Sequence, residues 1–533
     1  MRPAEGGGPL PRLDTHAVNR YIKIHTAHTF SMTAHEHDLR RHLRRFTTGI
    51  GIVVHDAGAP LIILAALSLA GCGREKKLTS ASADALRAYR EGVAQWEKFY
   101  YPEAKRSFED ALRHDSTFAL AWCRLAMVDA ASGSEGNAAG AMKEAVRLAP
   151  GATQREQLFI AMWHERLAFD NDRAAATADS LIRLYPDEKE AYLFRGALYE
   201  ELDKNYDAAL GCYGKAVGAD SGYAQAVMSL GYAYSTLGDQ QKGVELMQRY
   251  IRLAPDAADP RASYADLLVR AGRYDEALEQ YRKALELKPD YWYAVREIGT
   301  VYSILGRLKE AEEQFHRSLS LLPPGPEIEA ARLVADASLD SRRGNFSDAS
   351  AQFRRALAID SVNYAAAEGL VRTLGKLRDF DGARDVLRRI SRVLAQRHLT
   401  SSTAMLSYHL THAGLLTDEG DYAGALGACD SAAGYSLPLT RAAVERQRAQ
   451  THFAAGALED ALDDCGRALE VNPNSPVVLL TLVRIYSRSG DSRMTEEIGV
   501  RLQSLWANAD PDFDDRNELL RLMGKRSREG HPR

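Results

Sequence analysis

A sequence period of about 34 residues constrains the fold of this chain more than any other feature. Residues 271–289 align with residues 305–323. In both copies a glycine is followed by alanine five residues later, then by an aromatic residue after four more and by proline after eight more. The length of 533 residues alone suggests about three or four globular domains. A fixed short period predicts one stacked array instead, because a single repeat cannot bury its apolar face without a neighbour.

The residue types at the repeated positions are typical of paired antiparallel helices. Alanine at Ala277 suits a place where two helices approach too closely for a larger side chain. Proline at Pro289 cannot continue a helix, so it ends the second helix of its pair. Glycine at Gly272 marks the turn between the two helices. Each period therefore predicts two helices joined by a short turn.

In this spacing of small residue, aromatic residue and closing proline, the sequence resembles the tetratricopeptide-repeat (TPR) family. The resemblance implies an all-α fold, a TPR α-solenoid whose antiparallel helix pairs wind into a right-handed superhelix of about twelve repeats over residues 85–509. We expect degenerate copies at 364–397, 406–439 and 476–509, and a C-terminal capping helix with a charged tail over residues 510–533.

Composition excludes several classes of function. The 68 Lys and Arg residues nearly balance the 72 Asp and Glu residues, which argues against a surface built to bind nucleic acid. The hydrophobic share of 45% is that of a folded protein. The five cysteines are too few and too dispersed for a disulfide framework, and core positions are expected for those in the repeats. They are Cys72, Cys123, Cys212, Cys429 and Cys465.

The N-terminal region carries a second informative pattern. Residues 61–73 form an apolar run that ends in small residues and one cysteine, and arginines precede it at 40, 41, 44 and 45. This run is too short to span a bilayer as a lone helix, and its surroundings are typical of a secretory signal. Residues 69–72 resemble a bacterial lipobox. The resemblance implies that the chain is cut before Cys72 and that lipid is attached to the Cys72 thiol, which anchors the protein to a membrane.

The lipobox divides the chain into four parts. Residues 1–71 are expected to be an N-terminal extension and signal peptide that is removed, and residues 72–84 a lipidated cysteine with a polar tether. Because 71 residues exceed the usual length of a signal peptide, we expect translation to begin near Met32 or, as the alternative, nearer Val53. Residues 85–509 are the solenoid and 510–533 its C-terminal cap and tail.

No pattern of catalytic residues emerges. The segment from Gly369 to Leu377 lacks the spacing and the hydroxyl of a phosphate-binding loop, and neither a nucleophile elbow nor paired CxxC motifs occur. His409, His412 and His452 are better explained by packing or solvation than by a metal site. We therefore expect no enzyme, no cofactor, no metal and no small-molecule substrate.

The remaining candidate for function is the concave surface that TPR solenoids form from their first helices. Projecting one stripe of these helices gives aromatic and apolar residues in the N-terminal half and arginines in the C-terminal half, which suits a peptide with a hydrophobic anchor and an acidic segment. The alternative, that several of the aromatic residues pack between repeats, stays open. The candidates are Tyr89, Trp96, Met127, Trp163, Tyr232, Tyr293, Arg296, Arg372, Arg446 and Arg484.

The resemblance also bears on the type of partner. TPR modules that bind acidic chaperone tails use Lys and Asn residues from successive first helices, whereas this chain has Cys123, Met127 and Met228 at such positions. We predict a non-catalytic scaffold that binds proteins or peptides: a TPR lipoprotein of the bacterial envelope. Because Gly73 rather than Asp follows the cysteine, the resemblance favours the outer membrane, facing the periplasm. The alternative is a cytoplasmic TPR sensor or regulatory subunit of a signalling or transcription system.

Overall fold

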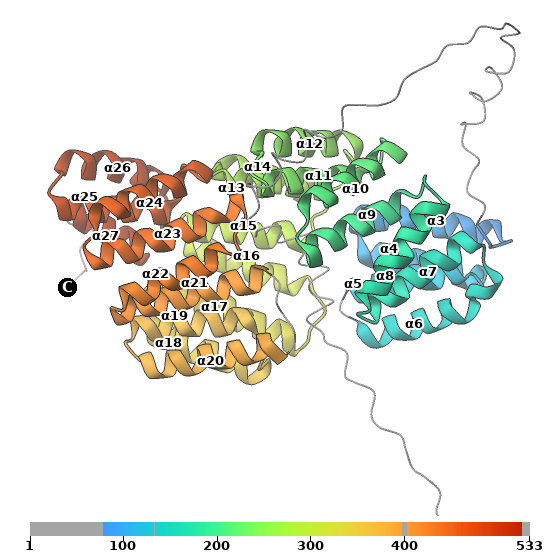
Figure 1. Cartoon of the computed structure of the whole chain (residues 1–533), viewed down its shortest axis with the longest axis horizontal. Coiled ribbons are helices and arrows are strands. Elements are labelled where there is room, and N and C mark those ends of the chain that lie inside the picture. Colours follow the sequence, from blue (N-terminus) through green and yellow to red (C-terminus); the bar gives the residue numbers. More distant parts are fainter. Residues whose placement is uncertain (1–77, 133, 397–401, 525–533) are drawn as a thin grey trace, which may run out of the picture.

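A computed structural model describes residues 78–132, 134–396 and 402–524, and within them every regular element is helical. Residues 1–71, the predicted lipidation residue Cys72 and the tail beyond residue 524 lie outside the described residues. Helices α3 to α26 form twelve consecutive pairs, and α27 follows them (Figure 1). This confirms the predicted all-α solenoid. No described helix is both long enough and apolar enough to cross a membrane.

The first helices of the pairs are α3 (Ala83–Glu97), α5 (Ala119–Ala131), α7 (Gln154–Leu167), α9 (Lys189–Leu198), α11 (Ala224–Thr236), α13 (Asp259–Arg270), α15 (Trp292–Ile304), α17 (Pro326–Arg342), α19 (Tyr364–Lys376), α21 (Ser402–Glu419), α23 (Pro438–Ala455) and α25 (Pro476–Ser489). A 3₁₀ turn η1 (Ala149–Gly151) precedes α7, and a π-helical turn η2 (Tyr199–Asp203) extends α9.

The second helices are α4 (Tyr101–His114), α6 (Glu135–Leu148), α8 (Asn171–Leu184), α10 (Tyr206–Ala219), α12 (Gln240–Leu253), α14 (Tyr274–Leu287), α16 (Leu308–Ser320), α18 (Phe346–Ile359), α20 (Phe380–Gln396), α22 (Tyr422–Ala433), α24 (Leu458–Val471) and α26 (Ser492–Leu505). The last helix is α27 (Asp514–Leu522). The degenerate copies therefore also form helix pairs.

The two helices of a pair meet where a small residue faces an aromatic ring. A Cβ atom added to Gly92 in α3 would lie 2.6 Å from the ring of Phe108 in α4, and one added to Gly299 in α15 would lie 2.9 Å from the ring of Phe315 in α16. Ala277 is fully buried, as predicted for a position of close approach. The aromatic ring thus fills the space that the missing side chain leaves, which explains why the sequence repeats both residue types together.

Distant repeats are in direct contact as well. The helix-pair turns at Gly238, Gly272 and Gly306 all have φ between +72° and +94°, and each contacts a segment of the C-terminal repeats. Pro438 lies against the first turn, Asn472 and Asn474 against the second, and Phe513 and Ala509 against the third. The hydrogen bonds across these contacts join residues 198 to 202 positions apart. Helices α13–α16 and α23–α27 accordingly share one hydrophobic core (Figure 1).

The N-terminal repeat makes a similar contact with the middle of the chain. The Ala258 amide donates a hydrogen bond of 3.0 Å to the Tyr100 hydroxyl, and Lys288 lies 3.1 Å from a carboxylate oxygen of Glu103. These contacts, like those of the C-terminal repeats, are not between neighbouring pairs. The solenoid is therefore tightly coiled, with parts of the chain far apart in sequence packed together.

One carboxylate in the coiled region collects three tyrosine hydroxyls. Tyr232, Tyr281 and Tyr293 each donate to Asp266, over 2.7, 2.5 and 2.7 Å. Protein encloses Asp266 but leaves it some solvent contact. Burial and the nearby charge of Glu297 raise the pKa of Asp266 to about 6, although the three hydroxyls oppose this rise. The side chain therefore takes up a proton more readily in the folded than in the unfolded chain.

Substituting Gly92 tests the close approach of paired helices. We expect Gly92→Ala to destabilise the chain by about 1–3 kcal/mol, because the added methyl group would collide with Phe108. Gly140→Ala in α6 is the matched control, since no atom lies within 4 Å of its added Cβ atom and alanine favours the helix. Thermal unfolding followed by circular dichroism measures both. Equal melting temperatures for the two variants would contradict this account of the repeat.

Asp266 predicts a pH dependence of stability. Because its pKa is higher in the folded chain than the ordinary 3.8, its contribution is fully present below about pH 4 and is lost as the pH rises through about 6. The free energy of unfolding of the wild type, relative to Asp266→Asn, should fall by up to about 3 kcal/mol between pH 4 and 7. Urea denaturation at a series of pH values measures it. Parallel pH profiles for the two proteins would show that Asp266 does not titrate in this range.

Candidate functional site

The first helices form the inner surface of the coil. Along the chain α5 contacts α7, α11 contacts α13, and α17, α19, α21, α23, α25 and α27 contact one another in turn. The second helices of neighbouring pairs approach one another less closely among the described residues. Elements on the inside of a curve lie closer together than those on its outside, so the first helices are the concave side. All but one of the thirteen residues of α5 are buried.

A pocket in the N-terminal half brings three of the predicted residues together. Trp96, Met127 and Trp163 line a small hollow of about 40 Å³ that is partly open to solvent. The Trp163 ring packs edge to face on Phe194, with 5.3 Å between the ring centres. Trp96, Met127 and Trp163 are each less than a tenth exposed, so they also belong to the core. The pocket is thus an apolar hollow with rigid walls.

Carboxylates surround this apolar floor. Glu190 lies 2.7 Å from Arg124, and Glu201 lies 2.5 Å from Arg166. Burial would raise the pKa of Glu190, but the charge of Arg124 and its hydrogen bond outweigh burial and hold the pKa below its ordinary value. The Tyr213 hydroxyl donates to Glu200, which also lines the pocket, over 2.6 Å. Polar groups at the pocket edge are therefore held in place by defined partners.

Tyr89, Tyr232 and Tyr293 have internal partners. Tyr89 packs against the rings of Phe108 and Phe118, and its hydroxyl accepts a hydrogen bond of 3.3 Å from Arg124. Burial raises the pKa of Tyr89 to about 12. Tyr232 and Tyr293 donate to Asp266 and are at most 5% exposed. These three residues pack between repeats, the alternative that the sequence left open.

Two of the predicted arginines are also paired. Arg296 lies 2.5 Å from Glu297 and over the rings of Trp292 and Tyr293. Arg484 donates two hydrogen bonds, of 2.7 and 2.5 Å, to the carboxylate of Glu518 in α27. Both arginines therefore already pair with a carboxylate of this chain. Their role in binding another protein stays a prediction.

Arg372 and Arg446 differ from the other candidates. They come from α19 and α23, and Arg342 lies at the end of α17. Burial, and then the charges of Arg372 and Arg342, lower the pKa of Arg446. Burial likewise lowers the pKa of Arg342, against the opposing charge of Asp515. The charges of Arg342 and Arg372 thus act on Arg446.

Sequence analysis missed Arg342. The residue in α17 that aligns with Arg372, one period of about 34 residues away, is Ser338. Arg342 follows Ser338 by one helical turn on the same face, so a search at one fixed register passes over it. A search that also covered the neighbouring turn would have found it.

One group of side chains has the donor atoms of a metal site. Glu312 and His316 in α16 and Asp336 in α17 place one ligand atom each within 4.8 Å of one another. Both carboxylates already have cationic partners, since Glu312 lies 2.9 Å from Arg343 and Asp336 lies 3.7 Å from Arg332. Elsewhere His409 stacks on Tyr435, and burial lowers its pKa. Burial also raises the pKa of the Cys429 and Cys465 thiols to about 12, which fits core positions.

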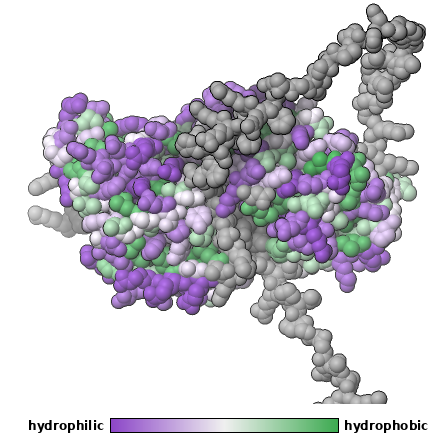
Figure 2. Space-filling model, viewed as in Figure 1, coloured by the Kyte–Doolittle hydropathy of each residue, from purple (hydrophilic) through white to green (hydrophobic). Residues whose placement is uncertain are grey.

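Exposed apolar side chains also occur on the second helices, away from the inner surface. Apolar residues lie scattered among hydrophilic ones on the face that Figure 2 shows. The large apolar side chains that are exposed come from many different helices, among them Val146, Phe169, Leu184, Leu287 and Val500. Val146 and Phe169 line one apolar hollow of about 330 Å³ together with Met142 and Leu167. Single exposed apolar residues such as Val500 are normal for a folded protein. An apolar hollow beside α6 and α7 therefore lies outside the set of residues that the sequence predicted.

Comparison with known proteins bears on the family. A sequence model described as "tetratricopeptide repeat" matches residues 203–258, 265–326 and 335–392. Among solved structures, the crystal structure of MamA is 27% identical and has a TM-score of 0.26, with 30% of this chain and 93% of that chain covered. A second crystal structure of MamA protein is 26% identical, with a TM-score of 0.26 and coverage of 31% and 91%. No curated protein matches the sequence. The matched residues are thus tetratricopeptide repeats, and the stacked helix pairs on both sides of them continue the same arrangement.

Proposed function

We propose that this chain is a non-catalytic scaffold that binds segments of partner proteins on its inner surface and is held at a membrane of the bacterial envelope by lipid on Cys72. The observation that carries the binding role is the pocket at Trp96, Met127 and Trp163. A rigid apolar hollow with polar groups at its edge is the type of site that receives an anchoring side chain.

The pattern before Cys72 supports the membrane anchor. The described residues begin at 78 and the first described helix at Ala83, so a cut before Cys72 would leave every described helix in place. A tether from Cys72 to Ala83 reaches at most about 40 Å when fully extended. The solenoid would then lie close to the membrane surface. Gly73 after the cysteine favours the outer membrane, with the solenoid in the periplasm.

Metabolic labelling tests the anchor. Cells that express the full chain with an alkyne fatty acid should label the wild type and the control Cys212→Ala, because Cys212 lies within helix α10. Cys72→Ala should lose the label and leave the membrane fraction. Persistent labelling of Cys72→Ala, or an unlabelled wild type in the soluble cytoplasmic fraction, would contradict the anchor and favour the regulatory alternative.

Filling the pocket tests the binding role. Ala197 lines the hollow, so Ala197→Trp should occupy it and remove those partners that crosslink to the wild-type chain in cells. Ala176→Trp makes the same change at an exposed position of α8 and should keep these partners. Circular dichroism before crosslinking verifies that both variants are folded. An unchanged set of crosslinked partners in Ala197→Trp would exclude this pocket as the binding site.

A further inference from the structure

Helices α16 and α17 bring an imidazole ring and two carboxylates to one place. Glu312 and His316 are four residues apart in α16, so they lie one turn apart on the same face of that helix. Asp336 of α17 joins them, and one ligand atom of each residue lies within 4.8 Å of those of the other two. We term these three residues the α16–α17 cluster. Sequence analysis passed over it because Asp336 follows His316 by 20 residues, in the next helix pair.

Little movement lets the three ligand atoms surround one ion. The Nε2 atom of His316 lies 2.7 Å from a carboxylate oxygen of Asp336, and because an ionised carboxylate can only accept, Nε2 donates this hydrogen bond. Around a zinc ion, bonds of about 2.0–2.2 Å place neighbouring tetrahedral ligand atoms about 3.4 Å apart. The hydrogen-bonded pair would separate by less than about 1 Å, and the third atom would close in by at most about 1.5 Å.

The arginine beside Glu312 has other partners. Arg343 lies 2.9 Å from Glu312, and it also lies 3.4 Å from a carboxylate oxygen of Asp340 and 3.4 Å from one of Asp512. When Glu312 turns to a metal ion, Arg343 keeps these two counter-charges. Leaving a guanidinium group without a partner costs free energy, and that cost does not arise here.

Asp336 is still less committed to its arginine. Arg332 donates hydrogen bonds of 2.7, 2.8 and 3.1 Å to the carboxylate of Glu329, two turns earlier in the same helix than Asp336. Asp336 lies 3.7 Å from Arg332, which is beyond hydrogen-bonding distance. Both ligand carboxylates of the cluster can therefore accept a further positive charge.

The surroundings of the cluster favour a cation. Five carboxylates face two guanidinium groups here, since Glu329, Asp340 and Asp512 stand beside the two carboxylates of the cluster. With His316 neutral, the net charge is therefore about minus three. The side chains of Glu312 and His316 are each 41% exposed, so an ion from solvent can reach them.

The donor atoms select the kind of cation. An imidazole nitrogen suits zinc and its neighbours among the transition metals, whereas Ca²⁺ takes about six to eight oxygen ligands and Mg²⁺ a near-ideal octahedron. Three protein ligands with nitrogen and carboxylate oxygen atoms, and a fourth position left open, form a set that zinc proteins use. The cluster fits zinc in both the number and the type of its ligands.

We propose that the α16–α17 cluster binds one zinc ion through Glu312, His316 and Asp336, with water in the fourth position. Binding displaces the proton from Nε2 of His316, and the neutral ring then carries it on Nδ1. The ion joins the second helix of one pair to the first helix of the next. This inference does not depend on the proposed scaffold function.

Competition with a chromophoric chelator for ZnCl₂ tests the inference on the full, metal-free chain. The wild type should bind one more zinc ion per chain than His316→Ala, in which any other zinc site of the chain is still counted. Glu312→Gln and Asp336→Asn should each weaken this binding at least about tenfold, because each removes a charged ligand. Glu312→Gln keeps the hydrogen bond between His316 and Asp336, so its loss of zinc would not come from that contact.

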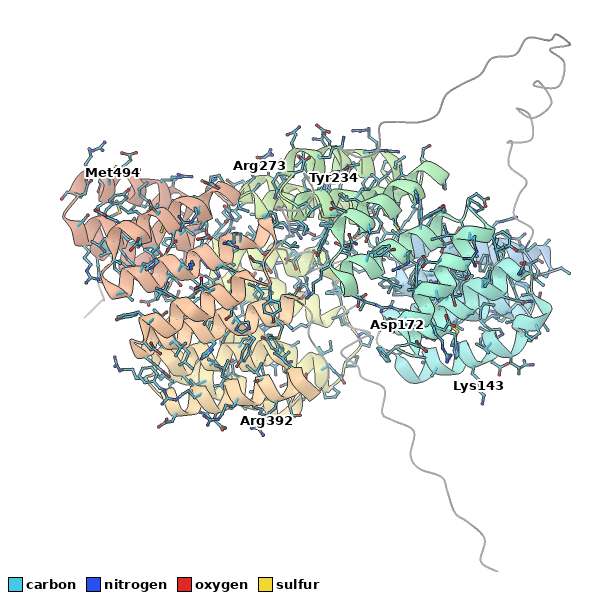
Figure 3. The ribbon with its side chains drawn as sticks, viewed as in Figure 1. Lys143, Asp172, Tyr234, Arg273, Arg392 and Met494 are labelled. Atoms are coloured by element: carbon cyan, nitrogen blue, oxygen red, sulfur yellow. The ribbon has the colours of Figure 1, made fainter. Side chains whose placement is uncertain are left out.

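Two matched controls make the same changes elsewhere. His114→Ala removes an exposed histidine that lies 3.7 Å from Asp110 in α4. Asp172→Asn removes an exposed carboxylate of α8, in the N-terminal half of the chain (Figure 3). Both should bind zinc as the wild type does. Circular dichroism of the metal-free proteins verifies that each variant is folded, and ZnCl₂ should raise the melting temperature of the wild type more than that of His316→Ala.

Three outcomes would overturn the proposal: equal numbers of zinc ions on the wild type and on His316→Ala, an equal loss of zinc with either control variant, or tighter binding of Ca²⁺ or Mg²⁺ than of zinc at the cluster. None of them bears on the crosslinking test of the pocket, because that test changes a residue of another helix pair.

Discussion

The close packing of each helix pair is the constraint on which the structure depends. A glycine or alanine of one helix faces an aromatic ring or another large side chain of the other, as Gly92 faces Phe108 and Gly299 faces Phe315. This contact fixes the distance and angle between the helices, and the same contact recurs along the array. The first helices are consequently brought together on one side, where they form the inner surface. Everything that surface carries, the apolar pocket and the predicted arginines alike, is positioned by these intra-pair contacts.

A second level of packing determines which inner residues stay available. Turns of the coil touch through residues about 200 positions apart, such as the Tyr274 hydroxyl and the carbonyl oxygen of Asn474. Neighbouring repeats in the middle of the chain bury Tyr232 and Tyr293 around Asp266. Further along the chain, the C-terminal helix α27 contributes Glu518 to Arg484, whereas no carboxylate among the described residues lies within 4 Å of Arg372 or Arg446. The packing of the whole coil therefore determines which inner side chains a partner protein can reach.

The repeat unit could be predicted from the sequence because the contacts that form it join residues within one period of about 34 residues. The period, the small residues and the closing prolines determine helix pairs, and the twelve described pairs match the expected count. The side-chain partners could not be predicted in the same way. Asp266 occurs in one copy of the repeat, and its three tyrosines come from three different helices. Arg342 lies one turn outside the aligned register. Contacts between turns of the coil depend on how small angles between pairs accumulate, which a period of about 34 residues does not specify.

The contacts at Gly238, Gly272 and Gly306 have a consequence for how this chain can change in evolution. Arrays of this kind ordinarily gain or lose whole repeats, since each unit needs only its neighbours. Here the turn at Gly272 meets Asn474 and the turn at Gly306 meets Phe513, each about 200 residues further along the chain. Duplicating or deleting a unit between these partners would shift every such contact by a full repeat at once. The length of this part of the array is therefore locked, and variation is left to single substitutions on its inner surface.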